Sequence, residues 1–581
     1  MNRRDFLTFG TNSTKRKQTR LFQSSVTRNQ NLTEQQLASR FLAQATFGPT
    51  RSLIDEVTAS GIEVWIDNQL AQPQTQTLQY MWDVVHPLYY IEDVPLLGIL
   101  PFRWAWWQAV MTGPDLLRQR VAMALSEIMV ISTRTDLLED ISIAVASWYD
   151  MLLKHAFGNF RDLLLDVTLH PAMGYYLSHA GNRKSNPATN RFPDENYARE
   201  VMQLFSIGLF ELNIDGTRKL DGDGEDIPTY NNGVISEFAK IFTGLTYQES
   251  DVWEEEGVDI NTEEGFSLAF MTFDNASLPM QMWDVYHESG EKRLLNGLVV
   301  PAGQTGMQDV EMAIDNLFNH PNVGPFMAHL LIQRLVKSNP SPAYIGRVAT
   351  AFNDNGAGVR GDMKAVVRAI LLDDEARNPA YVNDPAHGML REPFIRYTQL
   401  CRAFEAYNEE GENLFFNGGE MAAQELPQYP FASPSVFNFF SPDFQPLGPL
   451  QNAGLSGPEF QITTSVSAIK MINFVETAVL YDVLMDVPEG EIDEGSLPTD
   501  RVPRISDVLL NLEPYMPLNG NIPALLDQLD LLLTYGTLSN EMRQIITTAL
   551  TAYFDQTDEW EETVRFGISL LLNSMEYAIL K

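Results

Sequence analysis

Apolar side chains recur at intervals of three and four residues in segment after segment of this chain, and the alternation typical of strands is rare. Such intervals place side chains on one face of an α-helix, which can then be buried against other helices. Clear examples are Met312–Phe318, Gly324–Val336, Ala343–Phe352 and Met363–Leu372. The spacing predicts a mainly α fold, with many helices around one large core, a few short β-hairpins and long ordered loops.

The chain carries enough apolar side chains for a large interior, because hydrophobic residues make up 44% of its 581 positions. Trp104, Trp106 and Trp107 fall within the apolar stretch 102–130, and such a cluster favours core packing over a binding surface. Continuous apolar runs such as Ile141–Val145 are far shorter than the roughly 20 residues of a membrane-spanning helix. We therefore expect a globular core and no membrane span.

The charge balance and the cysteine content narrow the class of protein. Acidic residues number 76 and basic residues 40, which gives a formal net charge of −36. A surface of this sign repels phosphate backbones, so we expect no nucleic-acid partner. Cys401 is the single cysteine of the sequence, which excludes an internal disulfide and a zinc site built from several thiolates.

Composition along the chain predicts four parts. Residues 1–31 are rich in Arg, Lys, Thr, Asn and Gln, which is typical of a flexible basic tail. Helical patterning starts after Thr33, which is suited to cap a helix. The expected parts that follow the tail are a main helical domain at 32–485 that includes a loop-rich region at 409–458, an acidic linker at 486–504, and a C-terminal helical block of the same unit at 505–581.

The beginning of the chain permits two interpretations. Arg3 and Arg4 stand before Phe6 and Leu7, as in a twin-arginine export signal. An export signal also needs an apolar stretch of roughly 7–15 residues, whereas residues 8–17 are polar and basic. Either this is a degenerate signal and the protein is periplasmic or extracellular, or it is a disordered basic tail on a cytoplasmic protein.

Standard catalytic motifs are absent from the sequence. It contains no Walker A loop, no G-x-S-x-G nucleophile elbow and no H-E-x-x-H helix. Residues 356–361 do spell G-x-G-x-x-G, but the preceding residues 343–355 have a helical pattern where dinucleotide binding requires a strand. This stretch therefore predicts a glycine-rich turn between two helices.

The most distinctive polar segment is a predicted helix over Pro193–Gln203. Asp194 is placed to cap this helix, and Glu195 suits the positive end of the helix dipole. Glu195 and Arg199 are also spaced as an i,i+4 ion pair. At about 100° per residue one face is polar while the opposite face is apolar. The polar face carries Asn196, Arg199, Glu200 and Gln203.

A carboxylate, an amide and a guanidinium on one face can bind or activate a substrate. The same pattern also arises on a solvated helix face with one ion pair, or in a buried polar network that fixes the fold. The sequence leaves these alternatives open. Two histidines nine residues apart, His170 and His179, do not share a helix face as metal-binding pairs do. His287 lies in a polar stretch, and it joins His170 as a candidate to assist acid–base chemistry.

An Asp- and Gly-rich stretch at 215–226 predicts a long turn or a short hairpin between helices. Oxygen ligands at alternating positions suit calcium, although the Glu at the twelfth position of an EF-hand loop is missing. Calcium is therefore a possible cofactor, and its candidate ligands are Asp215, Asp221, Asp223 and Asp226.

Several separated stretches together resemble one protein family, the bacterial domain of unknown function 1800 (DUF1800). The stretches are residues 41–50, 170–177, 193–208, 239–245, 287–297, 320–325, 391–394 and 433–440. The resemblance covers the chain from about residue 32 to its last residue. It implies a bacterial protein of unassigned activity and a partner from a sulfatase-like family, DUF1501, with export through twin-arginine signals.

Two functions are expected from these observations, and whether the protein is an enzyme stays open. The first is a non-catalytic partner or assembly factor for an exported DUF1501 protein, which the absence of catalytic motifs favours. The second is an extracytoplasmic hydrolase with its site on the helix at 194–203. In that hydrolase Glu195 or Glu200 is the acid–base group, Asn196 and Arg199 orient the substrate, and His170 or His287 assists.

Overall fold

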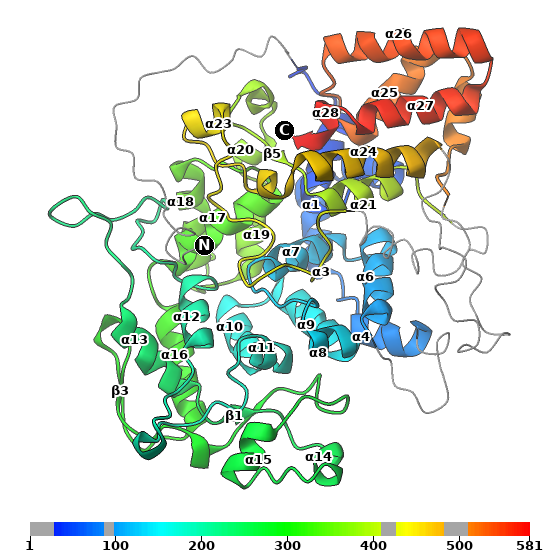
Figure 1. Ribbon diagram of the computed structural model, residues 1–581. Coiled ribbons are helices and arrows are strands. Elements are labelled where there is room, and N and C mark those ends of the chain that lie inside the picture. Colours follow the sequence, from blue (N-terminus) through cyan, green and yellow to red (C-terminus); the bar gives the residue numbers. More distant parts are fainter. Residues whose placement is uncertain (1–27, 86–97, 408–425, 481–508) are drawn as a thin grey trace.

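The computed structural model describes residues 28–85, 98–407, 426–480 and 509–581. Helices account for most of the regular structure, and the strands are two residues long (Figure 1). The mainly α fold predicted from the sequence is therefore confirmed. The predicted linker at 486–504, the motif at Arg3 and Arg4, and residues 408–425 of the loop-rich region lie outside the described residues.

The helices of the first part of the chain precede any strand. They are α1 (Glu34–Ala45), α2 (Arg51–Ser60), α3 (Ile62–Ala71), α4 (Thr77–Tyr80), the π-helix η2 (Met81–Val85), α6 (Leu100–Thr112), α7 (Leu116–Ser126), α8 (Asp136–Asp140), α9 (Ser142–His155), α10 (Phe160–Leu169), α11 (Pro171–Tyr176), η3 (Pro187–Thr189), α12 (Asn196–Gln203) and α13 (Asn232–Ile241).

The middle part adds short strands between its helices. Its elements are β1 (Leu245–Thr246), α14 (Asp251–Glu255), α15 (Glu263–Leu268), β2 (Gln281–Met282), η4 (Asp284–Tyr286), β3 (Lys292–Arg293), η5 (Leu295–Gly297), β4 (Val299–Val300), α16 (Gly306–Phe318), α17 (Val323–Leu335), α18 (Pro342–Asn353), α19 (Met363–Leu371), α20 (Asp374–Arg377), η6 (Pro379–Asn383) and β5 (Met389–Leu390).

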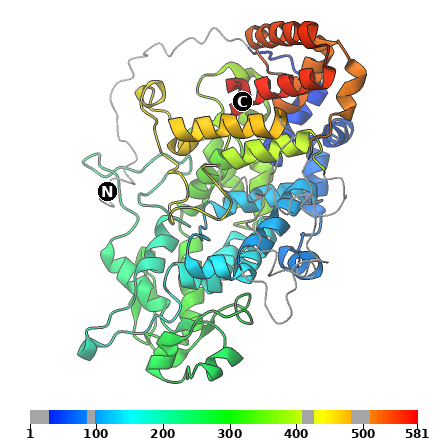
Figure 2. The same ribbon diagram turned by 45° about the vertical axis from the view of Figure 1, so that its right-hand side comes forward.

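The last part returns to helices. Its elements are α21 (Pro393–Ala403), α23 (Pro449–Asn452), η7 (Pro458–Ile462), α24 (Ser465–Leu480), η8 (Glu513–Leu518), α25 (Ile522–Leu533), α26 (Asn540–Thr557), α27 (Trp560–Leu572), α28 (Met575–Ala578) and β6 (Ile579–Leu580). In both ribbon views α26 and α27 form one end of the molecule and α14 and α15 the opposite end (Figures 1 and 2). No helix within the described residues is long and apolar enough to cross a bilayer.

The first helix shows how the local sequence sets an element. Thr33 accepts the backbone N–H of Gln36, and the Gln36 side chain accepts the N–H of Thr33, which forms a capping box. The helix then buries Phe41 and Leu42 completely. The helix cap expected at Thr33 is confirmed.

One continuous core runs through nearly the whole described chain, from Ala38 to Tyr577. The tryptophans expected to pack inside do so, since Trp104, Trp106 and Trp107 are all at most 5% exposed. The Trp106 and Trp107 rings pack edge to face with centroids 4.8 Å apart, an arrangement that aromatic quadrupoles favour.

The three small sheets are antiparallel pairs, β1 with β2, β3 with β4, and β5 with β6. The last pair joins Met389 to Leu580, so the end of the chain is tied to the segment before α21. The side chain of Arg40 in α1 also donates to the carbonyl oxygen of Lys581 over 2.7 Å. The C-terminal helices therefore share the core with the N-terminal ones.

Candidate functional site

Helix α12 begins at Asn196, whose backbone N–H donates to Asp194 Oδ1 over 2.7 Å. The expected pair is present, with Arg199 Nη2 at 3.1 Å from Glu195 Oε2. The hydroxyl of Ser236 donates to the other oxygen of Glu195 over 2.5 Å. Because both side chains of this pair are about one-third exposed, it contributes only a few tenths of a kcal/mol.

The polar stripe of α12 divides between core and surface. Glu200 is only 6% exposed and lies close enough to Tyr230 to influence it electrostatically. Burial, and then the nearby Glu200 carboxyl, raise the pKa of the Tyr230 phenol. Asn196, Arg199 and Gln203 remain partly accessible. The stripe is thus neither a fully solvated face nor a fully buried network.

The two candidate histidines are buried in separate local networks. His170 precedes α11 and accepts the N–H of Ala172 at its Nδ1 over 3.2 Å, while its Nε2 lies 3.3 Å from the Ser147 hydroxyl. Its ring packs edge to face against Trp148. Burial lowers the pKa of His170 to about 3, so this ring is neutral at physiological pH.

His287 lies in a second buried network that is centred on Asp309. Its Nε2 is 3.0 Å from Asp309 Oδ2, and its Nδ1 is 2.8 Å from the carbonyl oxygen of Thr243. Lys292, whose side chain is fully buried, donates to the same carboxylate over 2.5 Å. This arrangement ties the segment around β3 to α16.

The sequence predicts one long turn or short hairpin at 215–226, whereas the structure has two successive turns there, closed by antiparallel bridges from residue 212 to 218 and from 220 to 226. Asp215 accepts the hydroxyl of Thr217 over 2.6 Å, and Asp226 forms an ion pair with Arg218. Asp221 accepts backbone N–H groups from further along the turn. These carboxylates therefore stabilise the two turns themselves.

Asp223 is exposed at the tip of the second turn. Within the described ranges, no set of three or more His, Cys, Asp or Glu side chains is grouped so that it could hold a metal ion. The structure does not bring the four predicted ligands together. Calcium binding stays a prediction, which metal analysis of the purified protein tests directly.

The G-x-G-x-x-G stretch lies between α18 and α19, as expected for a helix–helix turn. The Asp354 carboxylate accepts the N–H groups of Gly356 and Gly358, so side chains of the turn occupy the backbone donors that a phosphate would need. Of the six catalytic candidates, four lie on α12 or directly before it, and His170 and His287 belong to the two networks described above. Gln203, the last residue of the polar face of α12, lines a cavity.

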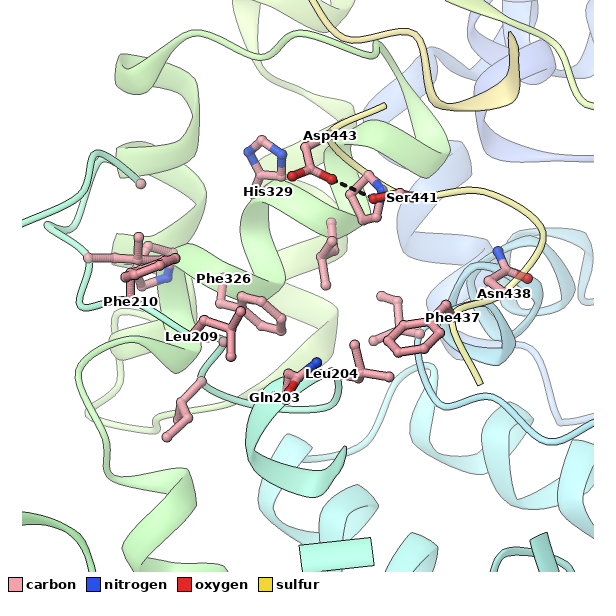
Figure 3. Close-up of a pocket in the computed structure, with 18 of the residues that line it drawn as sticks. Gln203, Leu204, Leu209, Phe210, Phe326, His329, Phe437, Asn438, Ser441 and Asp443 are labelled. Atoms are coloured by element: carbon pink, nitrogen blue, oxygen red, sulfur yellow. Dashed lines mark hydrogen bonds between the residues drawn. The ribbon is translucent and has the colours of Figure 1, made fainter. Parts of the chain in front are cut away.

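That cavity has a volume of about 200 Å³ and is bounded by four segments distant in sequence. They are the end of α7, the end of α12 with the loop that follows, α17, and the loop at 436–443. Figure 3 shows Phe326 of α17 and Phe437 of the loop on opposite sides, with Gln203 and Leu204 at one end. The apolar lining residues are Ile128, Leu204, Ile207, Leu209, Phe210, Leu212, Pro325, Phe326, Leu330, Val436, Phe437, Phe440 and Pro442.

One wall of the cavity contains buried charges. Glu127 follows α7, and Arg334 belongs to the last turn of α17. Arg334 Nε lies 3.3 Å from Glu127 Oε2, and Arg334 Nη2 donates to the Glu127 carbonyl oxygen over 3.0 Å. Both residues are at most 5% exposed.

Behind this pair lie more charged residues that do not line the cavity. Arg120 donates to the carbonyl oxygen of Arg334 over 2.5 Å. The side-chain amide of Gln428 donates to Glu392 and, over 3.4 Å, to Glu127 Oε1, so these two carboxyl groups lie close together. Burial, and then the charge of Glu392, raise the pKa of Glu127 well above its usual range. Burial also raises the pKa of Glu459 to about 8.

A second polar group lies at the other side of the cavity, where the loop at 436–443 passes α17. Ser441 donates to Asp443 over 2.5 Å, and His329 lies beside them in Figure 3. Burial, and then the positive charge of Arg334, lower the pKa of His329 to about 4, which keeps the ring neutral. Asn438 of the same loop has a left-handed backbone (φ 62°) and is 7% exposed.

Sequence reasoning did not single out Glu127, Arg334 or Asn438 as site residues. Each lies inside a segment whose dominant signal is apolar or loop-like, and their proximity depends on tertiary contacts. The sequence contains one signal that could identify two of them, namely a charged residue within a long apolar helical stretch. Such a residue is costly to bury unless it has a partner. Glu127 and Arg334 are such residues.

Together these features define a mainly α protein with a small-molecule-sized cavity that is apolar on most sides and charged on one. Residues 40–579 match the model of a family described as protein of unknown function (DUF1800), and the chain belongs to this family. The resemblance noted from the sequence is thereby confirmed. Neither the curated proteins nor the solved structures contain a match to this chain.

Proposed function

We propose that the protein binds a small, mainly apolar ligand group in the cavity between α12, α17 and the loop at 436–443. The observation that carries this proposal is the cavity itself, whose volume is about 200 Å³. A cavity of about 150 Å³ with similar apolar walls accommodates benzene. Ligand sites in proteins are typically concave and apolar, with a few polar groups that fix the orientation.

The geometry supports an aromatic or branched aliphatic group as the part that enters. Phe326 and Phe437 lie on opposite sides of the cavity, so a ring placed between them would contact an aromatic face or edge on each side (Figure 3). Burial of such a group gains roughly 25 cal/mol per Å² of apolar surface removed from water.

Calorimetric titration with propylbenzene derivatives tests this proposal. We expect saturable binding to the wild-type protein and none to Val436→Trp, because the larger side chain fills the cavity from its partly exposed wall. Val466→Trp is the matched control, since Val466 is 67% exposed on α24, and this variant should bind as the wild type does. Absence of binding to the wild type, or equal binding to both variants, would overturn the proposal.

A second candidate function is the role of assembly factor for a sulfatase-like DUF1501 protein. It is favoured by an apolar stripe along α24, where Val466, Ile469 and Ile472 are 67%, 58% and 43% exposed. Their spacing of three residues keeps them on one side of the helix, and the opposite side packs against the core through Met471 and Phe474. An apolar stripe of this kind is suited to contact with another protein.

Co-purification of the two proteins from the source bacterium tests the second candidate. We expect the pair to associate in low and moderate salt, and a triple variant with Ser at positions 466, 469 and 472 to lose the partner. Ile545→Ser is the control, because Ile545 is similarly exposed (55%) on another helix, α26. Failure to associate in any salt condition, or retention of the partner by the triple variant, counts against this role.

A further inference from the structure

The buried charged cluster at this wall of the cavity and behind it contains more carboxyl groups than guanidinium groups. Glu127, Glu392 and Glu459 are the carboxyl groups, and each is at most 4% exposed. Arg120 and Arg334 are the guanidinium groups, and each is at most 5% exposed. Because an uncompensated buried charge is costly, at least one of the three carboxyl groups retains a proton.

The position of Glu392 indicates which carboxyl group keeps its charge. Glu392 immediately precedes α21, where the partial positive charge of a helix N-terminus favours an ionised carboxylate. Glu127 lies beside it, because the Gln428 amide donates to both carboxyl groups, and two carboxyl groups this close in a buried site do not both ionise. Glu127 is then the protonated member of the pair, and it is the carboxyl group of the three that lines the cavity.

Asn438 provides an independent second donor. It lines the same cavity, it is 7% exposed, and no other described residue accepts a hydrogen bond from its Nδ2. Leaving a buried amide donor without an acceptor destabilises the protein. A ligand oxygen in the cavity would supply the missing acceptor.

We infer that Glu127 and Asn438 hold an uncharged oxygen acceptor, such as the carbonyl group of a ketone, ester or amide, at the polar end of the ligand. This inference rests on the proposed function, because it names the chemistry of the group that enters the same cavity. An ammonium group would meet donors and Arg334, and a carboxylate would have to give up the water that solvates its charge on entering a buried site. The acid that the hydrolase alternative requires is then Glu127, and not a residue of α12.

Four probes with the same phenylpropyl body test the inference by calorimetry at pH 7: propylbenzene, phenylpropanamide, phenylpropylamine and phenylpropanoate. We expect the amide to bind about five- to tenfold more tightly than propylbenzene, the gain of one neutral hydrogen bond. The amine and the carboxylate should bind no better than propylbenzene. The inference is wrong if either charged probe binds more tightly than the amide.

Variants separate this inference from the proposed function. In Asn438→Gly the glycine adopts the left-handed backbone without strain, and this variant lacks the amide donor. It should therefore still bind propylbenzene, but it should bind phenylpropanamide no more tightly than propylbenzene. Glu127→Gln retains a donor and should still bind phenylpropanamide more tightly than propylbenzene. Glu127→Ala should bind the two probes equally. If no probe binds the wild type, the proposed function fails. If propylbenzene binds and the amide gains nothing, only the present inference fails.

Discussion

Arg334 holds Glu127 from two directions, with its Nε 3.3 Å from Glu127 Oε2 and its Nη2 donating to the Glu127 carbonyl oxygen. The contact joins the last turn of α17 to the residue that follows α7. Since both side chains are buried, water cannot replace either partner. The pair therefore supports both the fold and the charged wall of the cavity.

Replacement of Arg334 by Met should be strongly destabilising. Removal of a buried cation from such a cluster typically costs about 3–5 kcal/mol, because the ionised carboxyl group that remains, Glu392, loses a compensating charge. Urea unfolding at pH 7 measures the change. Arg293→Met is the control, since Arg293 is 73% exposed in its pair with Glu291 and should cost less than about 1 kcal/mol. Similar losses for the two variants would contradict this expectation.

Asp309→Asn should destabilise the protein at pH 7 and much less in acid. Burial opposes ionisation of Asp309, but hydrogen bonds from His287 and Lys292 outweigh it and hold the pKa of this carboxyl below its usual value. Stability from a lowered carboxyl pKa is complete above the unfolded pKa, near 3.9, and is lost as pH falls through the folded pKa.

Unfolding free energies of the wild type and of Asp309→Asn, measured between pH 7 and pH 2, test this prediction. The difference should be about 3–5 kcal/mol at pH 7, where Lys292 is left without its partner, and should shrink below about pH 4. A difference that stays constant over the whole range would show that Asp309 is not stabilised as an ion.

His170 should make the protein less stable as the pH falls from about 6.5. Burial lowers the pKa of this ring to about 3 in the folded protein, so between these values the unfolded chain binds a proton that the folded chain does not. His170→Asn keeps an acceptor for the N–H of Ala172, so it preserves the helix cap. The variant should show a flatter dependence of unfolding free energy on pH between 7 and 4, and an unchanged slope would contradict this.

Gly48→Ala should cost more stability than Gly61→Ala, although both glycines have a positive φ. A Cβ at Gly48 would lie 2.8 Å from Gln399 Cα in α21, whereas a Cβ at Gly61 would meet nothing within 4 Å. Both variants carry the backbone strain of about 1–3 kcal/mol, and Gly48→Ala adds a steric clash. Thermal unfolding compares them, and an equal loss would argue against close packing of Gly48 on α21.

The sequence predicted the parts of the structure that depend on local pattern. Helical spacing located α16 to α19, and Thr33 marked the start of α1. The i,i+4 pair of Glu195 and Arg199 also follows from spacing alone. Such features depend on residues close in sequence, where helix geometry fixes which side chains meet.

The cavity could not be predicted in the same way. Glu127, Arg334, Glu392 and Asn438 belong to four separate segments, and nothing in their local patterns indicates that they approach one another. His170 and His287 show the same limit, since their local sequence did not indicate that both are buried and hydrogen-bonded within the core. Tertiary packing determines which polar residues face a cavity and which are hydrogen-bonded within the core.

The most direct test of the proposed site is a crystal structure with an iodinated phenylpropanamide, in which anomalous scattering locates the iodine. We predict that the ring lies between Phe326 and Phe437 and that its carbonyl oxygen is within hydrogen-bond distance of Glu127 and Asn438. A crystal that binds the probe only elsewhere on the protein, or not at all at a concentration that saturates the protein in solution, would contradict the assignment of this cavity as the ligand site.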